Sequence, residues 1–514
     1  MKALKGLLIY IGIVLGVILG IGIILFALMY FVPTFKIFGY GIVRQNSTVS
    51  ETVLDLSELE DYDDIVINVN SNSLNLGIIP KEDVVTDKKK DDNYLNEIDC
   101  SLQLSVFGFT NDITEYAFNH TFTEKNGTIT LNINVTEPKG LISASKSKLS
   151  VYVPNNLTYK LNCITDSGSI SLGNKNYKLD VSSLTITTNR GDLSLINMTD
   201  EEGVISLDNL NLTSEVGLFD LTALPIIEVK NATVLAGKDA DFRFANLRSS
   251  VVAKGEGVAI KATSIECGDD GFRVVADNAY INIEILQTKD IAENSIVADN
   301  ADIHISKVSG ETSILTTYGT VELGEVDNKC DIESSDADVT VGVAHDNISV
   351  LTKMGNIIVT NYEKSGNFVS DKGDINITND SAYSEGVTTN IVGTDGRITV
   401  INKANKLTLS TKGDAIVDIT FKEIANSPIE HSVILHERSS AVVYLPSNNY
   451  TSPFKFIAKG TISGQISGAT GGAYITSSDE PQYYPSASPE VIESSANNCS
   501  FIFNGTIEFR GHLY

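Results

Sequence analysis

Tryptophan is absent from the 514 residues, and methionine (4), cysteine (5) and proline (11) are scarce. No two cysteines have the Cys-x-x-Cys spacing, so the sequence indicates neither a zinc domain nor a disulfide framework. The hydrophobic share is 42%, which is enough for a packed core and excludes a wholly disordered chain. Length alone allows three or four ordinary domains, or one long repeat.

Acidic residues are missing from the first 50 positions, which hold four basic residues, and the first carboxylate is Glu51. The chain has 38 basic and 65 acidic residues, so 34 and 65 of them follow position 50. That part of the chain carries a net charge of −31, against −27 for the whole. Such an acidic surface repels phosphate backbones, and we expect no nucleic-acid partner.

Charge is also absent from the 26-residue run Leu7–Val32. At 1.5 Å per residue a helix of this length reaches about 39 Å, enough to cross a bilayer core of about 30 Å. The run is too long for the apolar part of a signal peptide, and Pro33 follows it. We predict a stub over 1–6, a transmembrane helix over 7–32 in the lipid bilayer, and a juxtamembrane linker over 33–50.

The orientation of this single-pass anchor rests on a weak charge bias, because basic residues flank the apolar run on both sides. A short N-terminal stub followed by a long domain is typical of a protein whose domain lies outside the cell membrane. We therefore expect the C-terminal part to be extracytoplasmic.

Three glycines of the run, Gly12, Gly16 and Gly20, fall on one helix face. This spacing lets two membrane helices approach closely, and it favours a homodimer or a membrane-protein partner. The alternative is that glycine is simply common in membrane helices.

A five-residue unit recurs beyond residue 160: a small residue, then any residue, an apolar one, any residue and another apolar one. The successive steps from Ala301 to Gly373 are 18, 18, 18 and 18 residues, and the next two are 23 and 17. A fixed period of this length is typical of a solenoid. The small residues that begin the units are Gly168, Gly191, Gly217, Ala240, Ala279, Ala301, Gly319, Ala337, Gly355, Gly373, Gly396 and Gly413; the unit near Gly255 fits only with a shifted start.

A second strand precedes each small residue, so two strands and two turns fill one rung. The fold class we predict is all-β: a parallel β-solenoid of about a dozen rungs, stacked about 4.8 Å apart. The third and fifth residues of each unit should point inward, and the small residue should lie where the chain turns tightly. We expect a β cap over 51–160, the repeats over 161–420, a second cap over 421–477, a flexible loop over 478–498 and terminal strands over 499–514.

The second residue of each unit points outward, and along the regular stretch carboxylates alternate with uncharged or basic residues. The series is Asp302, Thr320, Asp338, Asn356, Asp374, Arg397 and Asp414. Alternation avoids like charges on adjacent rungs. It also disfavours calcium, which needs several oxygens close together, and we expect no cofactor or metal.

The motif Leu-x-Val-Tyr-Val-Pro (Leu149–Pro154), followed by Tyr-x-Leu-x-Cys-x-Thr-x-Ser-Gly-Ser-Ile-Ser-Leu (Tyr159–Leu172) and repeated Gly-Asp-Ile or Gly-Asp-Leu strands, resembles a known family. That family is the putative-adhesin or toast-rack β-strand-repeat domain of bacterial envelope proteins, and the resemblance covers roughly 51–420. It implies a membrane-tethered β-solenoid, in some members encoded near envelope-stress regulators. The family has no established catalytic residues to carry over, and the stretch 203–260 departs from its pattern.

The six histidines are scattered. His304 is an outward residue, and His431 and His436 should lie on opposite faces of a strand. Cys267 and Cys330 suit a core position. We predict no catalytic residues and no enzyme activity.

The function that follows is that of a non-enzymatic, adhesin-like surface or envelope-structural protein with a surface protein or glycan as ligand. The alternatives are an accessory of an envelope-stress sensing system and, less favoured, a polysaccharide-acting β-helix enzyme.

Overall fold

The structure is a computed structural model that describes residues 2–32, 41–59, 62–81, 96–110, 116–137, 140–144, 146–289, 292–423, 427, 429–445, 454–459, 462–464, 482–483 and 499–511. Most of the described residues after the N-terminal helix form the strands of a parallel β-solenoid of about 13 turns, as the period predicts. The chain divides into two compact units, Met1–Lys230 and Asn231–Tyr514.

The uncharged run lies in helix α1 (Lys2–Phe31). Most of the side chains described in it, among them Leu15, Leu19 and Ile23, are exposed. A search of the described residues finds no helix that combines the length and the apolar character needed to cross a membrane.

The described residues of the first unit form α1, the short 3₁₀ helix η1 (Leu56–Glu58) and fourteen strands. The strands are β1 (Gly41–Asp55), β2 (Asp64–Asn70), β3 (Asn75–Pro80), β4 (Glu97–Thr110), β5 (Ala117–Lys125), β6 (Thr128–Thr136), β7 (Gly140–Ser143), β8 (Lys148–Val153), β9 (Thr158–Thr165), β10 (Ile170–Leu172), β11 (Asp180–Thr188), β12 (Leu193–Leu195), β13 (Val204–Leu207) and β14 (Asn209–Val229).

The edge of this unit is antiparallel. Strand β1 pairs with β4, and β4 pairs with β7 and β8, while β5 and β6 form a second antiparallel pair. The linker expected over 33–50 is therefore wrong from Gly41 onward, because that segment satisfies its backbone groups by pairing with β4. Residues 33–40 lie outside the described part of the chain.

Parallel rungs begin earlier than the sequence suggests. Strands β2 and β3 pair in parallel with β9 and β10, which lie about ninety residues further along the chain. The segment 51–160, which we predicted as a cap, thus supplies a rung, and its alternating Ile65, Ile67 and Val69 are buried like those of the repeats.

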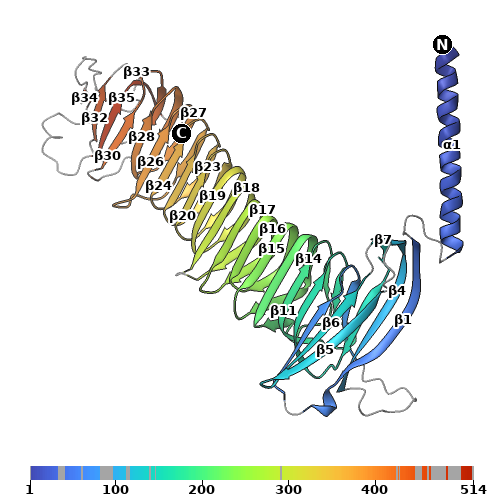
Figure 1. Ribbon diagram of the computed structural model, residues 1–514. Helices are drawn as coiled ribbons and strands as arrows, with labels where there is room; N and C mark the ends of the chain where they lie inside the picture. Colours follow the sequence, from blue (N-terminus) through green and yellow to red (C-terminus); the bar gives the residue numbers. More distant parts are fainter. Residues whose placement is uncertain are drawn as a thin grey trace. The chain divides into compact units, whose positions relative to one another are not determined.

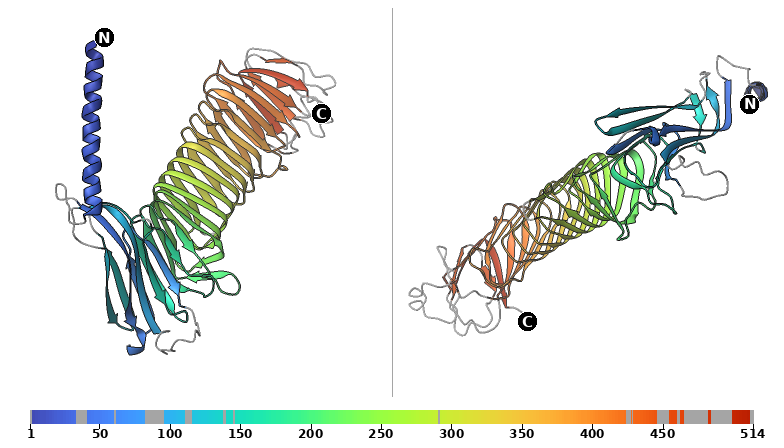
Figure 2. Two further views of the ribbon diagram at one scale, coloured as in Figure 1. Left: turned by 90° about the vertical axis from the view of Figure 1, so that its right-hand side faces the viewer. Right: turned by 90° about the horizontal axis from the view of Figure 1, so that it is seen from below.

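The secondary structure described in the second unit is made of strands (Figures 1 and 2). They are β15 (Thr233–Arg248), β16 (Val251–Cys267), β17 (Phe272–Thr288), β18 (Glu293–Val308), β19 (Glu311–Val326), β20 (Cys330–Ser334), β21 (Asp338–Ala344), β22 (Ile348–Thr352), β23 (Ile357–Tyr362), β24 (Gly366–Ser370), β25 (Ile375–Asn379), β26 (Thr388–Gly393), β27 (Gly396–Asn402), β28 (Lys406–Thr411), β29 (Ala415–Phe421), β30 (Glu430–Ile434), β31 (Ser440–Leu445), β32 (Phe454–Lys459), β33 (Ile462–Gly464), β34 (Gln482–Tyr483), β35 (Cys499–Asn504) and β36 (Thr506–Gly511).

These rungs stack in parallel and in register, so each residue lies on its equivalent in the rung before. Ala279 pairs with Ala301, and Ala301 pairs with Gly319. The third and fifth residues of the units point inward as predicted: Ile303 and Ile305 are at most 1% exposed. Figure 1 shows β15 to β19 as successive long strands, each of which bends through a corner of its rung.

Two units start elsewhere than the sequence alignment placed them. In the unit near Gly255, Val258 occupies the small-residue position, because it pairs with both Ala240 and Ala279. In the last repeat, Arg397 pairs with Ile416 rather than with Asp414. This register lets the guanidinium of Arg397 reach the carboxylate of Asp418, at 2.6 Å.

The small-residue column is set by close contact between backbones. A Cβ placed on Gly373 would overlap the carbonyl oxygen of Gly355, and one on Gly355 would overlap that of Ala337. A buried hydroxyl three residues upstream holds the same turn: Ser370 Oγ accepts from the backbone N–H of Gly373 at 2.9 Å, and Thr352 Oγ1 accepts from that of Gly355 at 3.0 Å. This Ser/Thr-x-x-Gly/Ala pattern was visible in the sequence and was not recognised.

The C-terminal strands are out of chain order. Strands β35 and β36 pair in parallel with β30 and β31, and β32 and β33 pair with their other side. The predicted terminal strand pair over 499–514 is therefore an internal rung of the cap predicted over 421–477. Apart from β34, the flexible loop predicted over 478–498 lies outside the described residues.

Replacing Gly373 with alanine should lower the free energy of unfolding by about 1–3 kcal/mol, since the added methyl must displace the Gly355 carbonyl. Urea unfolding of the full chain measures this. Gly268→Ala is the control, because a Cβ there meets only Ser250 Oγ at 3.2 Å. Equal stability of the two variants would contradict the close-contact explanation.

Candidate functional site

An exposed aliphatic column runs across three successive rungs of the second unit. Val275 pairs with Val297, and Val297 pairs with Leu315. Their side chains point away from the core and are 51%, 38% and 46% exposed. The neighbouring positions of the column are charged, Lys254 before and Glu333 after, so the apolar stretch is confined to three rungs.

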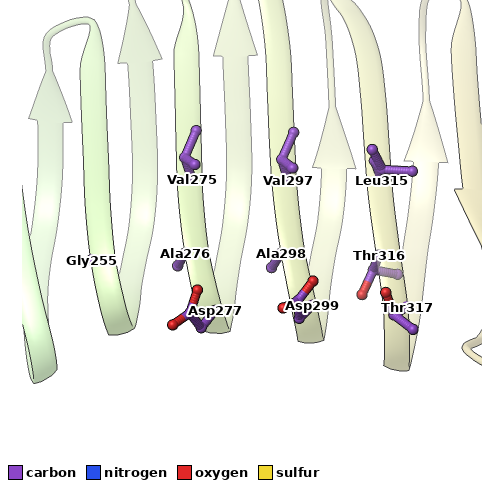
Figure 3. Close-up of a pocket in the computed structure, with 10 residues that line it drawn as sticks. All are labelled: Gly255, Val275, Ala276, Asp277, Val297, Ala298, Asp299, Leu315, Thr316 and Thr317. Atoms are coloured by element: carbon purple, nitrogen blue, oxygen red, sulfur yellow. The ribbon is translucent and has the colours of Figure 1, made fainter.

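The floor beside this column is made of small residues. Ala276 and Ala298 are buried at the corner of their rungs, Thr316 follows them, and Gly255 precedes them without a side chain. The result is an open groove of about 390 Å³ (Figure 3). In this view Val275, Val297 and Leu315 form one wall.

The opposite wall carries two carboxylates. Asp277 and Asp299 are exposed and lie on adjacent rungs, because the residues before and after them are paired in register (Figure 3). Thr317 continues this wall. Neither aspartate has a side-chain hydrogen bond or an ion pair with another described residue.

At other positions of the second unit amides or opposite charges separate stacked carboxylates, although Glu293 and Glu311 also lie in register on adjacent rungs. Asn356 donates to Asp338 at 3.0 Å and accepts from the backbone N–H of Asp374 at 2.9 Å, so the two carboxylates are separated by a rung. One rung before Asp277, Glu256 lies 3.6 Å from the ammonium of Lys238. The predicted alternation of the outward column is thus confirmed up to Arg397, whereas the groove carries two carboxylates on adjacent rungs with no amide or basic residue between them.

The sequence contained a signal for this groove that was missed. The pentapeptide Val-Ala-Asp-Asn-Ala occurs twice, over 275–279 and 297–301. Repetition of a pentapeptide at one repeat interval places each residue on its copy. A smaller hollow of about 220 Å³ in the first unit has no free pair of stacked carboxylates: Lys178 and Asp180 pair with each other at 2.6 Å, and Asp200 accepts from the backbone N–H groups of Glu202 and Val204.

A second polar cluster joins four successive rungs at another edge of the second unit. Lys307 lies 2.9 Å from Glu325 and 3.3 Å from Asp327, and His345 lies 3.1 Å from both Glu325 and Glu363. Glu325, Asp327 and His345 present donor atoms within 4.8 Å of one another, a set that suits a metal ion. The ammonium of Lys307 already pairs with both carboxylates, so the cluster works as an ion-pair network between rungs.

The charges of this network shift one another's protonation. Glu363, and next Glu325, raise the pKa of His345 above its usual 6.5, although partial burial opposes them. Lys307 and then His345 lower the pKa of Glu325. Both shifts favour the charged forms that hold the rungs together.

The glycines predicted as a helix-dimer face lie in α1. Nothing lies within 4 Å of a Cβ built on Gly16 or Gly20, so this part of the face is open. The surroundings of Gly12 lie outside the described side chains. The dimer stays a prediction.

The remaining sequence predictions concern single side chains. His304 is outward and half-exposed, as predicted, and pairs with Glu322 at 3.0 Å. His431 is 1% exposed, its Nδ1 accepts from the backbone N–H of Leu407, and burial lowers its pKa to about 3, so it is a neutral core residue. Cys267 and Cys330 are buried free thiols, and burial raises both pKa values to about 12, which makes them unreactive.

Comparison with known proteins does not assign this chain to a family. No family model matches the chain, and no curated protein matches it. A crystal structure of a putative cell adhesion protein from Clostridium sporogenes ATCC 15579 is aligned over 91% of this chain and 100% of its own, with 10% identity and a TM-score of 0.16. Agreement at this level transfers neither fold nor activity.

The His345 network predicts a pH dependence. Because the folded-state pKa of His345 is raised, its contribution to stability is complete below pH 6.5 and is lost as the pH rises through the folded-state value. An NMR titration should give a His345 pKa above 6.5 in the native chain and a lower value in Glu363→Gln. Glu284→Gln, an exposed change on another rung, should leave it unaltered. A native value at or below 6.5 would refute this assignment.

Proposed function

We propose that this chain is a non-enzymatic, adhesin-like surface or envelope-structural protein. An N-terminal helix anchors it in the cell membrane, and its solenoid lies on the extracytoplasmic side as a binding surface. The family resemblance in the sequence supports the same assignment, which would make the chain a toast-rack β-strand-repeat protein.

The observation that supports a binding role is the difference between outward side chains that are bonded to the adjacent rung and those that are not. Many outward polar side chains on the regular rungs form hydrogen bonds with the adjacent rung, as in the pairs Asn367–Ser349 at 3.1 Å and Asn390–Asn367 at 2.9 Å. These side chains stabilise the stacking of the rungs. The groove beside Asp277 and Asp299 offers a ligand two carboxylates that are not bonded to another described residue.

The membrane anchor in this proposal rests on the sequence. The run Leu7–Val32 has no charge, and the acidic part of the chain begins only at Glu51. A short, basic N-terminal stub favours the orientation with the solenoid outside.

An accessory role in envelope-stress sensing is the second candidate. The open glycine face at Gly16 and Gly20 supports it, because a close-packing helix face suits a membrane-protein partner.

Sidedness is tested with tags at the two ends of the full chain. A C-terminal tag should be removed when intact cells are treated with protease, whereas an N-terminal tag should be lost only after permeabilisation. Deleting residues 7–32 should move the protein out of the membrane fraction. Protection of the C-terminal tag in intact cells, or membrane retention of the deletion variant, would refute the anchored surface role.

Crosslinking separates the two candidates. A Gly16→Cys variant with no other change in α1 should give disulfide-linked self-pairs or no product if the surface role is correct. A heterologous membrane protein in the product would favour the sensing role instead. Ile18→Cys, about 200° round the helix, is the control and should crosslink less to any specific partner.

A further inference from the structure

We infer that the groove between Val275, Val297 and Leu315 on one side and Asp277 and Asp299 on the other binds an extended segment of another polypeptide, in which basic residues alternate with aliphatic ones. The inference rests on the proposed function, since it names the class of ligand that the solenoid surface takes.

The charge of the groove selects a cation. Two carboxylates on adjacent rungs, about 4.8 Å apart by the strand spacing, repel each other, and no described side chain neutralises either one. Two basic residues lie near Asp277 without forming an ion pair with it. Lys254 is paired with Val275 on the adjacent rung, and Arg273 lies four positions along β17 from Asp277, or about 13 Å at the rise of a strand. A ligand that brings two ammonium or guanidinium groups would relieve the repulsion, and the acidity of the whole chain would attract it.

The other wall favours a ligand in which an apolar side chain lies next to each basic one. Val275, Val297 and Leu315 form an aliphatic strip that water covers in the free protein, and burying such surface favours association. The floor of Ala276 and Ala298 leaves room for side chains to enter. The lining residues include no aromatic ring, on which a sugar would stack, so the walls suit an aliphatic and basic peptide better than a glycan.

The geometry also fits a chain rather than a compact ligand. The groove is open and crosses three rungs, so it presents its two walls side by side along the direction in which the rungs stack (Figure 3). An extended peptide places successive side chains on opposite faces, so a segment lying edge-on to the floor directs basic residues to one wall and aliphatic residues to the other.

The experiment uses the full-length chain and a fluorescent six-residue peptide of alternating lysine and valine, with binding measured by anisotropy at several salt concentrations. We expect saturable binding that weakens with salt. The double variant Asp277→Asn with Asp299→Asn should weaken it about tenfold, as expected for the loss of two exposed ion pairs. Val297→Thr should weaken it about threefold.

The controls keep charge and apolar content matched. Glu284→Gln with Asp302→Asn removes two exposed carboxylates from the same two strands, β17 and β18, outside the groove, and should leave binding unchanged. Ile285→Thr, which changes an aliphatic side chain that is 41% exposed, is the control for Val297→Thr. Peptides of glutamate with valine, or of lysine with serine, should bind less.

A stability measurement distinguishes a binding role from a structural one. Removing two stacked like charges should leave the melting midpoint unchanged or raise it while binding is lost. A lowered midpoint, equal effects of groove and control variants, absence of lysine–valine binding, or tight binding of a neutral oligosaccharide that survives the aspartate changes would each overturn the inference. These results are independent of the protease experiment, so the ligand assignment can fail while the surface role stands, and the reverse.

Discussion

The close approach of one rung's backbone to the next is the constraint on which the rest of the second unit depends. Parallel rungs share backbone hydrogen bonds at a fixed spacing, so each residue is stacked on its equivalent. Where the chain turns, Gly355 and Gly373 leave no space for a side chain, because the carbonyl of the rung before fills it. The hydroxyls of Thr352 and Ser370 then satisfy the backbone N–H groups that the turn would otherwise leave unpaired.

Stacking also makes every outward charge a neighbour of the equivalent residue on the adjacent rungs. Repulsion between stacked like charges is reduced in two ways. Carboxylates alternate with amides, as at Asp338 and Asn356, or opposite charges pair, as in the Lys307–Glu325 ion pair. Asp277 and Asp299 follow neither pattern. Glu293 and Glu311, which are also stacked in register, do not follow them either, but they lie outside the lining of the groove. It is therefore the combination of two unbonded carboxylates with an aliphatic wall that gives Asp277 and Asp299 their functional weight.

Both ends of the described strands depart from chain order. Strands β2 and β3 form a rung with strands far along the chain in the first unit, and β35 and β36 enter between earlier strands in the second. A solenoid end exposes unpaired backbone groups, and atypical terminal elements protect it from pairing with other chains. The antiparallel strands β1, β4 and β5 serve this purpose at the edge of the first unit.

The sequence by itself determined the fold class, the 18-residue period and the inward residues, because burial of the same two positions in every rung leaves a period that can be read directly. It also determined the alternation of charge up to Arg397 and the core positions of Cys267 and Cys330. Only the tertiary structure decided that Val258 and Ile416 shift their units, that β35 is an internal strand, and that His345 joins Glu325 to Glu363. These features depend on the register between segments that are 18 or more residues apart. The pairing of whole strands sets this register, and local residue patterns do not determine it. The groove was determined partly by each. The sequence contains its pentapeptide twice, and the stacking of the rungs places the two copies side by side.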